Sequence, residues 1–410
     1  MHSRRGPVPI EQSRKSLRRA EISEESCSGE AEINRATDVQ ITSQPTIPIA
    51  APMLTDEDTR RVLDVLQSGQ LVAGRRVREF EQAFTAYLGV AHGAATSSGS
   101  TALEVALEAV GAPPGARVIT TPFSFVATTN AILRRGAIPV FADIDPETYN
   151  LNPHAVADVV ARTPDVWGLL PVHLYGLPCP MDALMVLARR HHLVVIEDAA
   201  QAHGAAFRGR KVGTLGDAGI FSFYPSKNLT TGEGGMVVTG DAGVAVRARM
   251  LANVGQSAQY VYEAVASNAR MTEMAAAIGI GQLATLDERN LRRRHNAARL
   301  SAELRDLDWL GLPVEPEGST HVYHQYTLRV PGHRDRLVQH LAACGIGTRV
   351  YYPTPIHRSP LYQRLGYGDA RCPEAERAAG EVLSIPVHPA LGEEELRRIV
   401  QAIRRFDPRH

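Results

Sequence analysis

The sequence predicts an α/β fold in which a mostly parallel sheet flanked by helices forms a large domain, followed by a smaller α/β domain. From about Ser98 onward, short apolar runs alternate with stretches of helical spacing. The apolar runs are nearly continuous, which is typical of strands buried on both faces of a parallel sheet. The chain has 410 residues, 44% of them hydrophobic, enough for a substantial core and more than one domain. We therefore expect a large domain over 46–295 and a small C-terminal domain over 296–410.

The first 45 residues differ in composition from the rest of the chain. They are rich in Ser, Glu, Arg and Gln, with hardly an aromatic residue. Such a segment cannot bury enough surface to offset its conformational entropy, so we expect a disordered extension over 1–45. Order should begin near Ile47. Thr55 is expected to cap a helix starting at Asp56, and a second amphipathic helix is expected over about 77–88.

Strands and helices alternate through the predicted large domain. The predicted strands are 117–120, 139–142, 167–172, 193–196, 219–223 and 235–239. A long helix is expected from Ala275 to Arg294, and 304–405 should mix helices with strands such as 326–330. This alternation predicts a parallel sheet with helices on both faces.

Charge and cysteine content exclude several classes of protein. Lys plus Arg and Asp plus Glu both number 44, so no net charge indicates a nucleic-acid or membrane partner. There is no apolar run of eighteen residues and no signal-peptide pattern. The histidines lack metal-ligand spacing, and no metal is expected. The four cysteines lack CxxC spacing, which favours a reduced, cytoplasmic setting. They are Cys27, Cys179, Cys344 and Cys372.

Lys227 is the most informative residue of the chain. It follows an apolar strand and precedes the loop Gly232-Glu-Gly-Gly, so it can face the ligand edge of the sheet. An aldehyde cofactor needs a lysine that can lose its proton, which partial burial near another cationic group provides. Taken alone, Lys227 has a simpler explanation as an ordinary loop lysine.

Asp198 and Gln201 lie at the end of the predicted strand 193–196. Ligands of open α/β sheets bind beyond the carboxyl ends of strands, so Asp198 is placed where a ligand would be. A carboxylate there can pair with a protonated pyridine nitrogen and make the ring an electron sink, while Gln201 can donate to a phenolic oxygen. Capping of the next helix would also explain Asp198.

Small residues at another strand end predict an anion site. The helix that starts near Ser98 offers free N–H groups and its dipole, and the hydroxyls of Ser100 and Thr101 add donors for a phosphate. Ser222 is a further candidate donor. Capping alone would also produce Ser-Gly-Ser-Thr. Phe125, after strand 117–120, can stack on a flat cofactor, although a core position would explain a single Phe equally well.

Together these segments resemble the DegT/DnrJ/StrS sugar aminotransferases, a family of fold-type I pyridoxal-phosphate enzymes. The resemblance covers about 47–405. The matching motifs are Ser98-Gly-Ser-Thr, Phe125-Val-Ala-Thr, Glu197-Asp-Ala-Ala-Gln-Ala-His-Gly, the segment Phe221–Gly235 around Lys227, Asn268-Ala-Arg-Met and Tyr352-Pro-Thr-Pro-Ile-His.

The resemblance implies a role for each residue. Lys227 would carry pyridoxal 5'-phosphate as a Schiff base and move protons. Asp198 would pair with the pyridine nitrogen, Gln201 with the phenolic oxygen, and Phe125 with the ring face. Ser100, Thr101 and Ser222 would hold the phosphate. Asn268 would reach the phosphate of a neighbouring subunit, which implies a homodimer with composite active sites. His357 would lie near the sugar-nucleotide end.

The implied activity is transfer of an amino group from an amino acid, glutamate by resemblance, to a nucleotide-linked 3- or 4-keto-hexose. A keto-cyclitol of an aminoglycoside pathway is the alternative acceptor. Some relatives are dehydratases, and these have His at the position of Lys227. The lysine of this chain therefore argues against dehydratase activity. A non-catalytic regulator would not need the lysine, the aspartate and the phosphate-site hydroxyls, so their presence argues against a regulator.

One segment departs from the family pattern. Where many relatives have Arg-Tyr-x-His before the asparagine, and tyrosines beside it, this chain has Gln259-Tyr-Val-Tyr, Ser267 and Ala269. The segment borders the substrate in relatives. The departure therefore concerns the substrate more than the cofactor.

Overall fold

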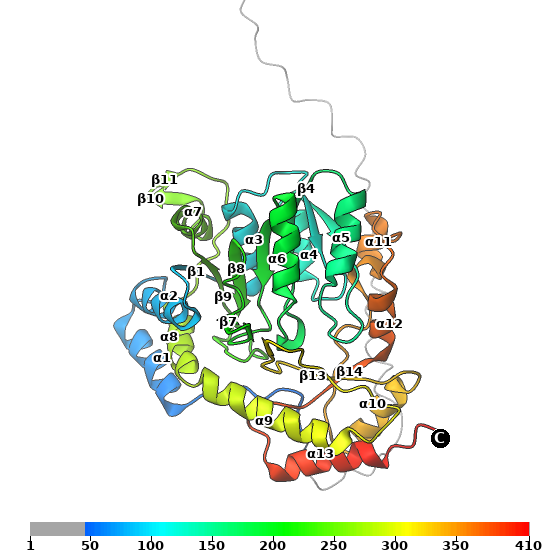
Figure 1. The fold of residues 1–410 in the computed structure, drawn as a ribbon. Helices are drawn as coiled ribbons and strands as arrows, with labels where there is room; N and C mark the ends of the chain where they lie inside the picture. Colours follow the sequence, from blue (N-terminus) through cyan, green and yellow to red (C-terminus); the bar gives the residue numbers. More distant parts are fainter. Residues whose placement is uncertain (1–45, 410) are drawn as a thin grey trace, which may run out of the picture. The chain divides into compact units, whose positions relative to one another are not determined.

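A computed structural model describes residues 46–409 of the protein (Figure 1). The predicted extension, 1–45, lies outside the described residues. Within the described part, a seven-stranded sheet has the strand order β1-β9-β8-β5-β4-β2-β3. Its strands are β1 (His92–Thr96), β2 (Arg117–Thr120), β3 (Ile138–Phe141), β4 (Val166–Leu170), β5 (Val194–Asp198), β8 (Ala218–Ser222) and β9 (Gly235–Thr239). Only β9 is reversed, because it pairs antiparallel with both neighbours while the other pairs are parallel. The predicted fold class, an α/β fold with a mostly parallel sheet, is confirmed.

Helices flank this sheet and continue beyond it (Figure 1). Those of the first part are α1 (Asp56–Ser68), α2 (Arg75–Leu88), α3 (Gly99–Ala109), α4 (Ala127–Arg134), α5 (Pro153–Arg162), α6 (Met181–His191) and α7 (Ala242–Ala252). Thr55 caps α1 as predicted, and its hydroxyl accepts a hydrogen bond from Asp58 N. The N-terminus of α2 is capped by a residue distant in sequence. The buried carboxylate of Glu273 accepts hydrogen bonds from the N–H groups of Gly74, Arg76 and Val77.

Small strand pairs and the C-terminal part complete the described fold. The pairs are β6 (Ala206–Phe207) with β7 (Arg210–Lys211) and β12 (Ser319–Thr320), the hairpin β10 (Gln256–Ala258) with β11 (Val261–Tyr262), and β13 (Tyr326–Arg329) with β14 (Val382–Ile385). The remaining helices are α8 (Glu273–Ala284), α9 (Leu286–Leu304), α10 (Arg334–Ala343), η3 (Ile356–Arg358), α11 (Pro360–Arg364), α12 (Pro373–Glu381) and α13 (Glu393–Arg405), with η2 (Leu174–Gly176) after β4.

Two elements differ from the prediction. The single helix expected from Ala275 to Arg294 is two helices, which meet at Thr285 (φ −112°, ψ 5°). The break arises because the halves pack on different partners: α8 contacts α1 and α2, whereas α9 contacts α13. Strand β1 was not predicted, since its sequence His-Gly-Ala-Ala-Thr lacks an apolar run. The predicted domain boundary at 295 falls inside α9, and the division into two domains stays a prediction.

The topology brings several strand ends to one edge of the sheet. Strands β2, β4, β5 and β8 run in the same direction, so their carboxyl ends meet there. Asp198 is the last residue of β5, and the segments that follow β2 and β8 carry Phe125 and Lys227. The fold therefore gathers at one edge residues from a stretch of sequence that runs from Phe125 to Lys227.

Candidate active site

Asp198 ends β5 as a buried carboxylate. Its side chain accepts two hydrogen bonds, from Thr128 Oγ1 on α4 (2.8 Å) and from Ala200 N (3.1 Å). Burial raises the pKa of Asp198 above its ordinary value, and these hydrogen bonds and the charge of Lys227 act against that rise. Thr128 belongs to the motif Phe125-Val-Ala-Thr, but its role as a partner of Asp198 was not predicted.

Lys227 lies in the loop between β8 and β9. Its backbone N–H donates to Tyr224 O (2.9 Å), which holds the loop in a turn. Burial lowers the pKa of Lys227 to about 8, and the negative charge of Asp198 acts in the opposite direction. Lys227 and Asp198 are thus close enough to influence each other. A substantial fraction of an amine with this pKa is neutral and nucleophilic near pH 8.

The predicted phosphate donors come from two elements that touch. A Cβ built on Gly99, the first residue of α3, would lie 2.5 Å from Ser222 Cβ and 2.9 Å from Ser222 Oγ. The hydroxyl of Thr101 forms a capping box with Ser98, accepting from Ser98 N (3.0 Å). Ser100 is exposed in the first turn of α3. The structure therefore brings Ser222 to the N-terminus of α3, with Ser100 open to solvent and Thr101 occupied by the cap.

Tyr352, for which no role was predicted from the sequence, contacts both Gln201 and Phe125. Gln201 Oε1 accepts from Tyr175 N (2.8 Å), and Gln201 Nε2 donates to the Tyr352 hydroxyl (3.1 Å). The Tyr352 ring lies 6.4 Å from that of Phe125. Phe125 is 57% exposed, so it is not the core residue of the simpler explanation. Tyr352 opens one of the family motifs, which was the signal that could have found it.

Two predicted residues are not brought into this cluster. His357 is fully buried, with Nε2 3.1 Å from Glu376 Oε1 on α12 and its ring 6.0 Å from that of Phe141. Burial lowers its pKa. Asn268 is exposed, although the next residue is anchored beside the start of α3 through Ser97 N, which donates to Ala269 O (2.7 Å).

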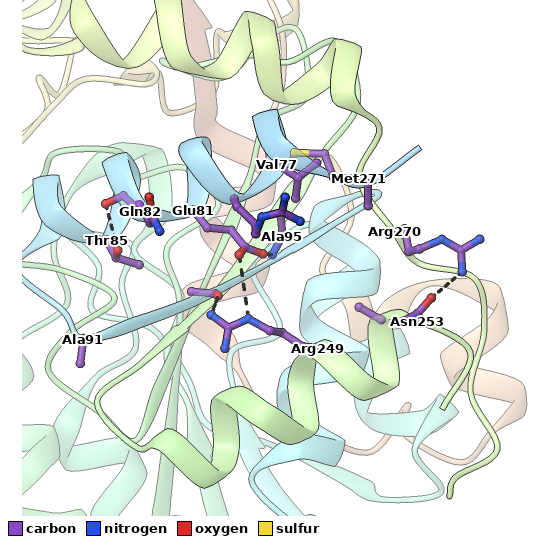
Figure 2. Close-up of a pocket in the computed structure, with 15 residues that line it drawn as sticks. Val77, Glu81, Gln82, Thr85, Ala91, Ala95, Arg249, Asn253, Arg270 and Met271 are labelled. Carbon is purple, nitrogen blue, oxygen red and sulfur yellow. Dashed lines mark hydrogen bonds and ion pairs between the residues drawn. The ribbon is translucent and has the colours of Figure 1, made fainter. Parts of the chain in front are cut away.

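A groove of about 540 Å³ lies beside the segment that carries Asn268 (Figure 2). Figure 2 shows Arg270 donating to Asn253 Oδ1 (2.8 Å), and Arg249 facing Glu81 (3.9 Å). Burial raises the pKa of Glu81. The groove runs along β1, the edge strand of the sheet, whereas Lys227 lines a separate cavity of about 20 Å³. The larger groove therefore marks the neighbourhood of Asn268 and not of the lysine.

Several other kinds of site find no support in the described residues. Over 46–409, no group of three or more His, Cys, Asp or Glu side chains is arranged to hold a metal ion. Cys179, Cys344 and Cys372 are free. In the same part of the chain no helix is long and apolar enough to cross a membrane.

The structure thus combines a buried carboxylate and an amine of lowered pKa at the carboxyl edge of a parallel sheet, with a helix N-terminus nearby, an arrangement suited to amine chemistry. Comparison with known proteins agrees with this class. The chain belongs to the DegT/DnrJ/EryC1/StrS aminotransferase family, whose model matches residues 52–404. It is an enzyme, an aminotransferase.

Three relatives illustrate the range of names in the family. The chain is 43% identical over 350 residues to a "pleiotropic regulatory protein" of Geobacillus stearothermophilus (84% of this chain, 93% of the relative). It is 42% identical to the dTDP-3-amino-3,4,6-trideoxy-alpha-D-glucose transaminase of Streptomyces venezuelae (87% and 92%). The crystal structure of S. venezuelae DesV matches with a TM-score of 0.84 at 40% identity (89% and 100%).

Proposed function

We propose that the protein transfers an amino group from an amino acid, glutamate by resemblance, to a nucleotide-linked 3- or 4-keto-hexose, using pyridoxal 5'-phosphate. The observation that carries the proposal is the pair of Lys227, with a pKa of about 8, and the buried Asp198 at the carboxyl edge of the sheet. The name of the S. venezuelae relative, a transaminase acting on a dTDP-linked sugar, supports the acceptor.

The residues present fit pyridoxal phosphate. Asp198 would pair with the ring nitrogen, and no Lys, Arg or His among the described residues forms an ion pair with its carboxylate. Phe125 is 57% exposed, so its ring would be available for stacking. Ser222 and the N-terminus of α3, with Ser100, would hold the phosphate. Gln201 donates only one of its two amide hydrogens in the structure, to Tyr352, and can offer the other to the phenolic oxygen.

When bound, this cofactor supplies an electron sink for the electrons left on the substrate carbon after deprotonation. The protein supplies the rest. Lys227 would be the residue to which the cofactor is covalently attached. Once released, its amine would take a proton from the substrate carbon and give it to the cofactor carbon to which the lysine had been attached. A pKa near 8 suits both directions of proton transfer. Asp198 would keep the ring nitrogen protonated by its charge.

Exposed residues support a homodimer with composite active sites. The β10–β11 hairpin and the segment after it present Tyr260, Tyr262 and Val265 to solvent, exposed by 76, 61 and 100%. Such apolar surface is unusual for a protein that stays monomeric. Asn268 lies in the same segment and is exposed; its Oδ1 accepts one long hydrogen bond, from Arg270 N (3.5 Å), and its side chain can still reach another subunit. A second copy of the chain is thus the proposed cover for this surface.

A keto-cyclitol acceptor is the second candidate, because nothing in the cofactor site separates a nucleotide-linked sugar from a free cyclic ketone. The dehydratase alternative is weakened by Lys227 itself. A cytoplasmic location is proposed from the free cysteines. For His357, a role in substrate binding is the weakest part of the proposal. Its side chain is occupied by contacts with Glu376 and Phe141.

The proposal is tested by adding pyridoxal phosphate to the wild type and to Lys227→Ala and reducing each with borohydride. We expect a covalent adduct on the peptide that contains Lys227 in the wild type only, and loss of the visible absorption band when glutamate is added before reduction. An adduct on another lysine, or a band that no amino donor removes, would contradict the proposed function.

A further inference from the structure

The substrates in the proposed function carry oxyanions, so the entrance to the Lys227 site needs a cation free to bind one. Two arginines of α9, Arg289 and Arg293, line the small cavity that contains Lys227. Both are already committed: Arg289 donates to Gln282 Oε1, and Arg293 to the carbonyl oxygens of Tyr323 and His324. The cavity of about 20 Å³ has room for a water molecule and for little more. Because both side chains are buried and the cavity is this small, these two cations leave no space for a carboxylate or a phosphate beside them.

Arg349 differs from these two arginines because it is exposed. Its backbone is fixed to β14 by two hydrogen bonds, from Arg349 N to Ser384 O (3.1 Å) and from Ser384 N to Arg349 O (2.8 Å). In an extended segment the side chains of alternate residues lie on the same side, so Arg349 and Tyr351 share a side. The Arg349 side chain hydrogen-bonds to the Tyr351 side chain. Arg349 is exposed, and the described part of the chain gives it no carboxylate partner.

Tyr351 connects Arg349 to the candidate active site. The Tyr351 ring lies 5.8 Å from that of Tyr352, the residue that accepts a hydrogen bond from Gln201. The Tyr175 hydroxyl, in turn, donates to Tyr351 O, which fixes the backbone there. Tyr351 also interacts electrostatically with Tyr224, whose carbonyl accepts the N–H of Lys227.

Exposed and half-buried aromatic side chains lie around Tyr351 and Tyr352. Tyr224 is 51% and Phe125 57% exposed, while Tyr351 and Tyr352 are half-buried. Arg349 has no carboxylate partner among the described residues and spends part of its guanidinium on Tyr351, so its other N–H groups can bind a charged group of a molecule whose reacting carbon points inward to Lys227. The planar fork of arginine matches the two oxygens of a carboxylate or a phosphate.

We propose that Arg349 and the hydroxyl of Tyr351 form an oxyanion-binding subsite beside the Lys227 site. This inference rests on the proposed function for the identity of its ligand. The oxyanion is either a carboxylate of the amino donor or the diphosphate of a nucleotide-linked sugar. The two share their chemistry toward a guanidinium, and they belong to different halves of the reaction.

Binding of two probes that do not react tests the subsite without turnover. Glutarate stands for the amino donor and inorganic pyrophosphate for the nucleotide, each titrated calorimetrically into the cofactor-loaded wild type, Arg349→Gln and Arg349→Lys. We expect Arg349→Gln to weaken one probe by about tenfold or more, and Arg349→Lys to keep part of that affinity. The matched control is Arg405→Gln, an exposed arginine at the end of α13.

The probe whose affinity falls in Arg349→Gln identifies the source of the oxyanion: glutarate indicates the amino donor, and pyrophosphate indicates the nucleotide-linked sugar. Affinities within about twofold of the wild type for both probes, or an equal loss in Arg405→Gln, would overturn the subsite. Single-turnover assays then separate this result from the proposed function. Arg349→Gln should raise the concentration of donor or sugar needed for half-maximal rate in one half-reaction only. If the wild type binds the probes through Arg349 but transfers no amino group, the subsite stands and the proposed function falls.

Discussion

Gly99 and Ser222 are in such close contact that a Cβ on Gly99 would lie 2.5 Å from the Cβ of Ser222. The contact joins the first residue of α3 to the last residue of β8. A glycine is required there for space, since its backbone does not lie in the left-handed region. The proposed phosphate site depends on how closely these two elements approach.

Gly99→Ala should therefore push α3 away from β8. We expect a loss of about 1–3 kcal/mol in the free energy of unfolding, measured with urea, together with weaker binding of pyridoxal phosphate. In the double variant Gly99→Ala/Ser222→Gly most of the stability should return, because the clashing Cβ is gone. Additive losses in the two single variants and the double variant would show that the contact does not matter.

The pKa of Lys227 can be measured through its reactivity. In the cofactor-free protein the rate of acetylation of Lys227 should rise with pH around the pKa of about 8. In Asp198→Asn the inflection should move to lower pH, because the charge that raises the pKa of Lys227 is removed. Peptide mass spectrometry follows each lysine separately. Lys211, whose charged partner is Asp287, is the internal control and should not shift. An upward movement of the Lys227 inflection would contradict the assignment.

Thr128→Val should make stability more dependent on pH. Burial raises the pKa of Asp198, so its ionisation opposes folding as the pH rises above the ordinary aspartate pKa. The variant loses the 2.8 Å hydrogen bond that favours the carboxylate, which raises this pKa further. We expect a loss of about 1–3 kcal/mol at neutral pH and a smaller loss at acidic pH.

Urea unfolding at several pH values measures this difference. The control is Thr129→Val, because Thr129 is the adjacent buried threonine and faces Tyr362 instead of Asp198. Its effect should not change between acidic and neutral pH. A pH-independent loss in Thr128→Val as well would exclude Asp198 as the cause.

Composite active sites can be tested by mixing inactive variants. Lys227→Ala and Asn268→Ala should each lose most activity, yet co-refolding equal amounts should restore roughly a quarter of the wild-type rate, because half of the dimers are mixed and each has one intact site. Mixing Lys227→Ala with Asp198→Asn should restore nothing, since both residues belong to one subunit's site. Equal recovery in the two mixtures, or none in the first, would contradict sharing of Asn268 between subunits.

Much of the fold could be predicted because the strands are continuous apolar runs. The start of β2 at Arg117 and both ends of β9 agree with the predicted ranges. By contrast, β1 has a Gly and two Ala residues, and only its pairing with β9 makes it a strand. The break at Thr285 also depends on tertiary packing, which no local pattern in a continuous helical stretch reveals.

The candidate site was predictable where a motif ends a strand. Asp198 and Ser222 each end a strand and Lys227 lies in the loop after one, and the parallel strands bring these ends to one edge. Their partners Thr128 and Tyr352 come from other elements, 70 and 151 positions away from Asp198 and Gln201 respectively. Such distant pairs leave no local signal in one sequence. Thr101 shows the opposite case, since its hydroxyl serves the local cap that a Ser-Gly-Ser-Thr sequence also predicts.

The loop that carries Lys227 and the β10–β11 hairpin are attached to the sheet in different ways. The loop that carries Lys227 is closed at its base by the pairing of Ser222 with Gly235 and by a hydrogen bond from Thr231 N to Phe223 O. An insertion there would disturb the lysine directly. The β10–β11 hairpin, in contrast, pairs only with itself and lies outside the seven-stranded sheet. Its length and sequence can therefore change while the reactive amine stays in place.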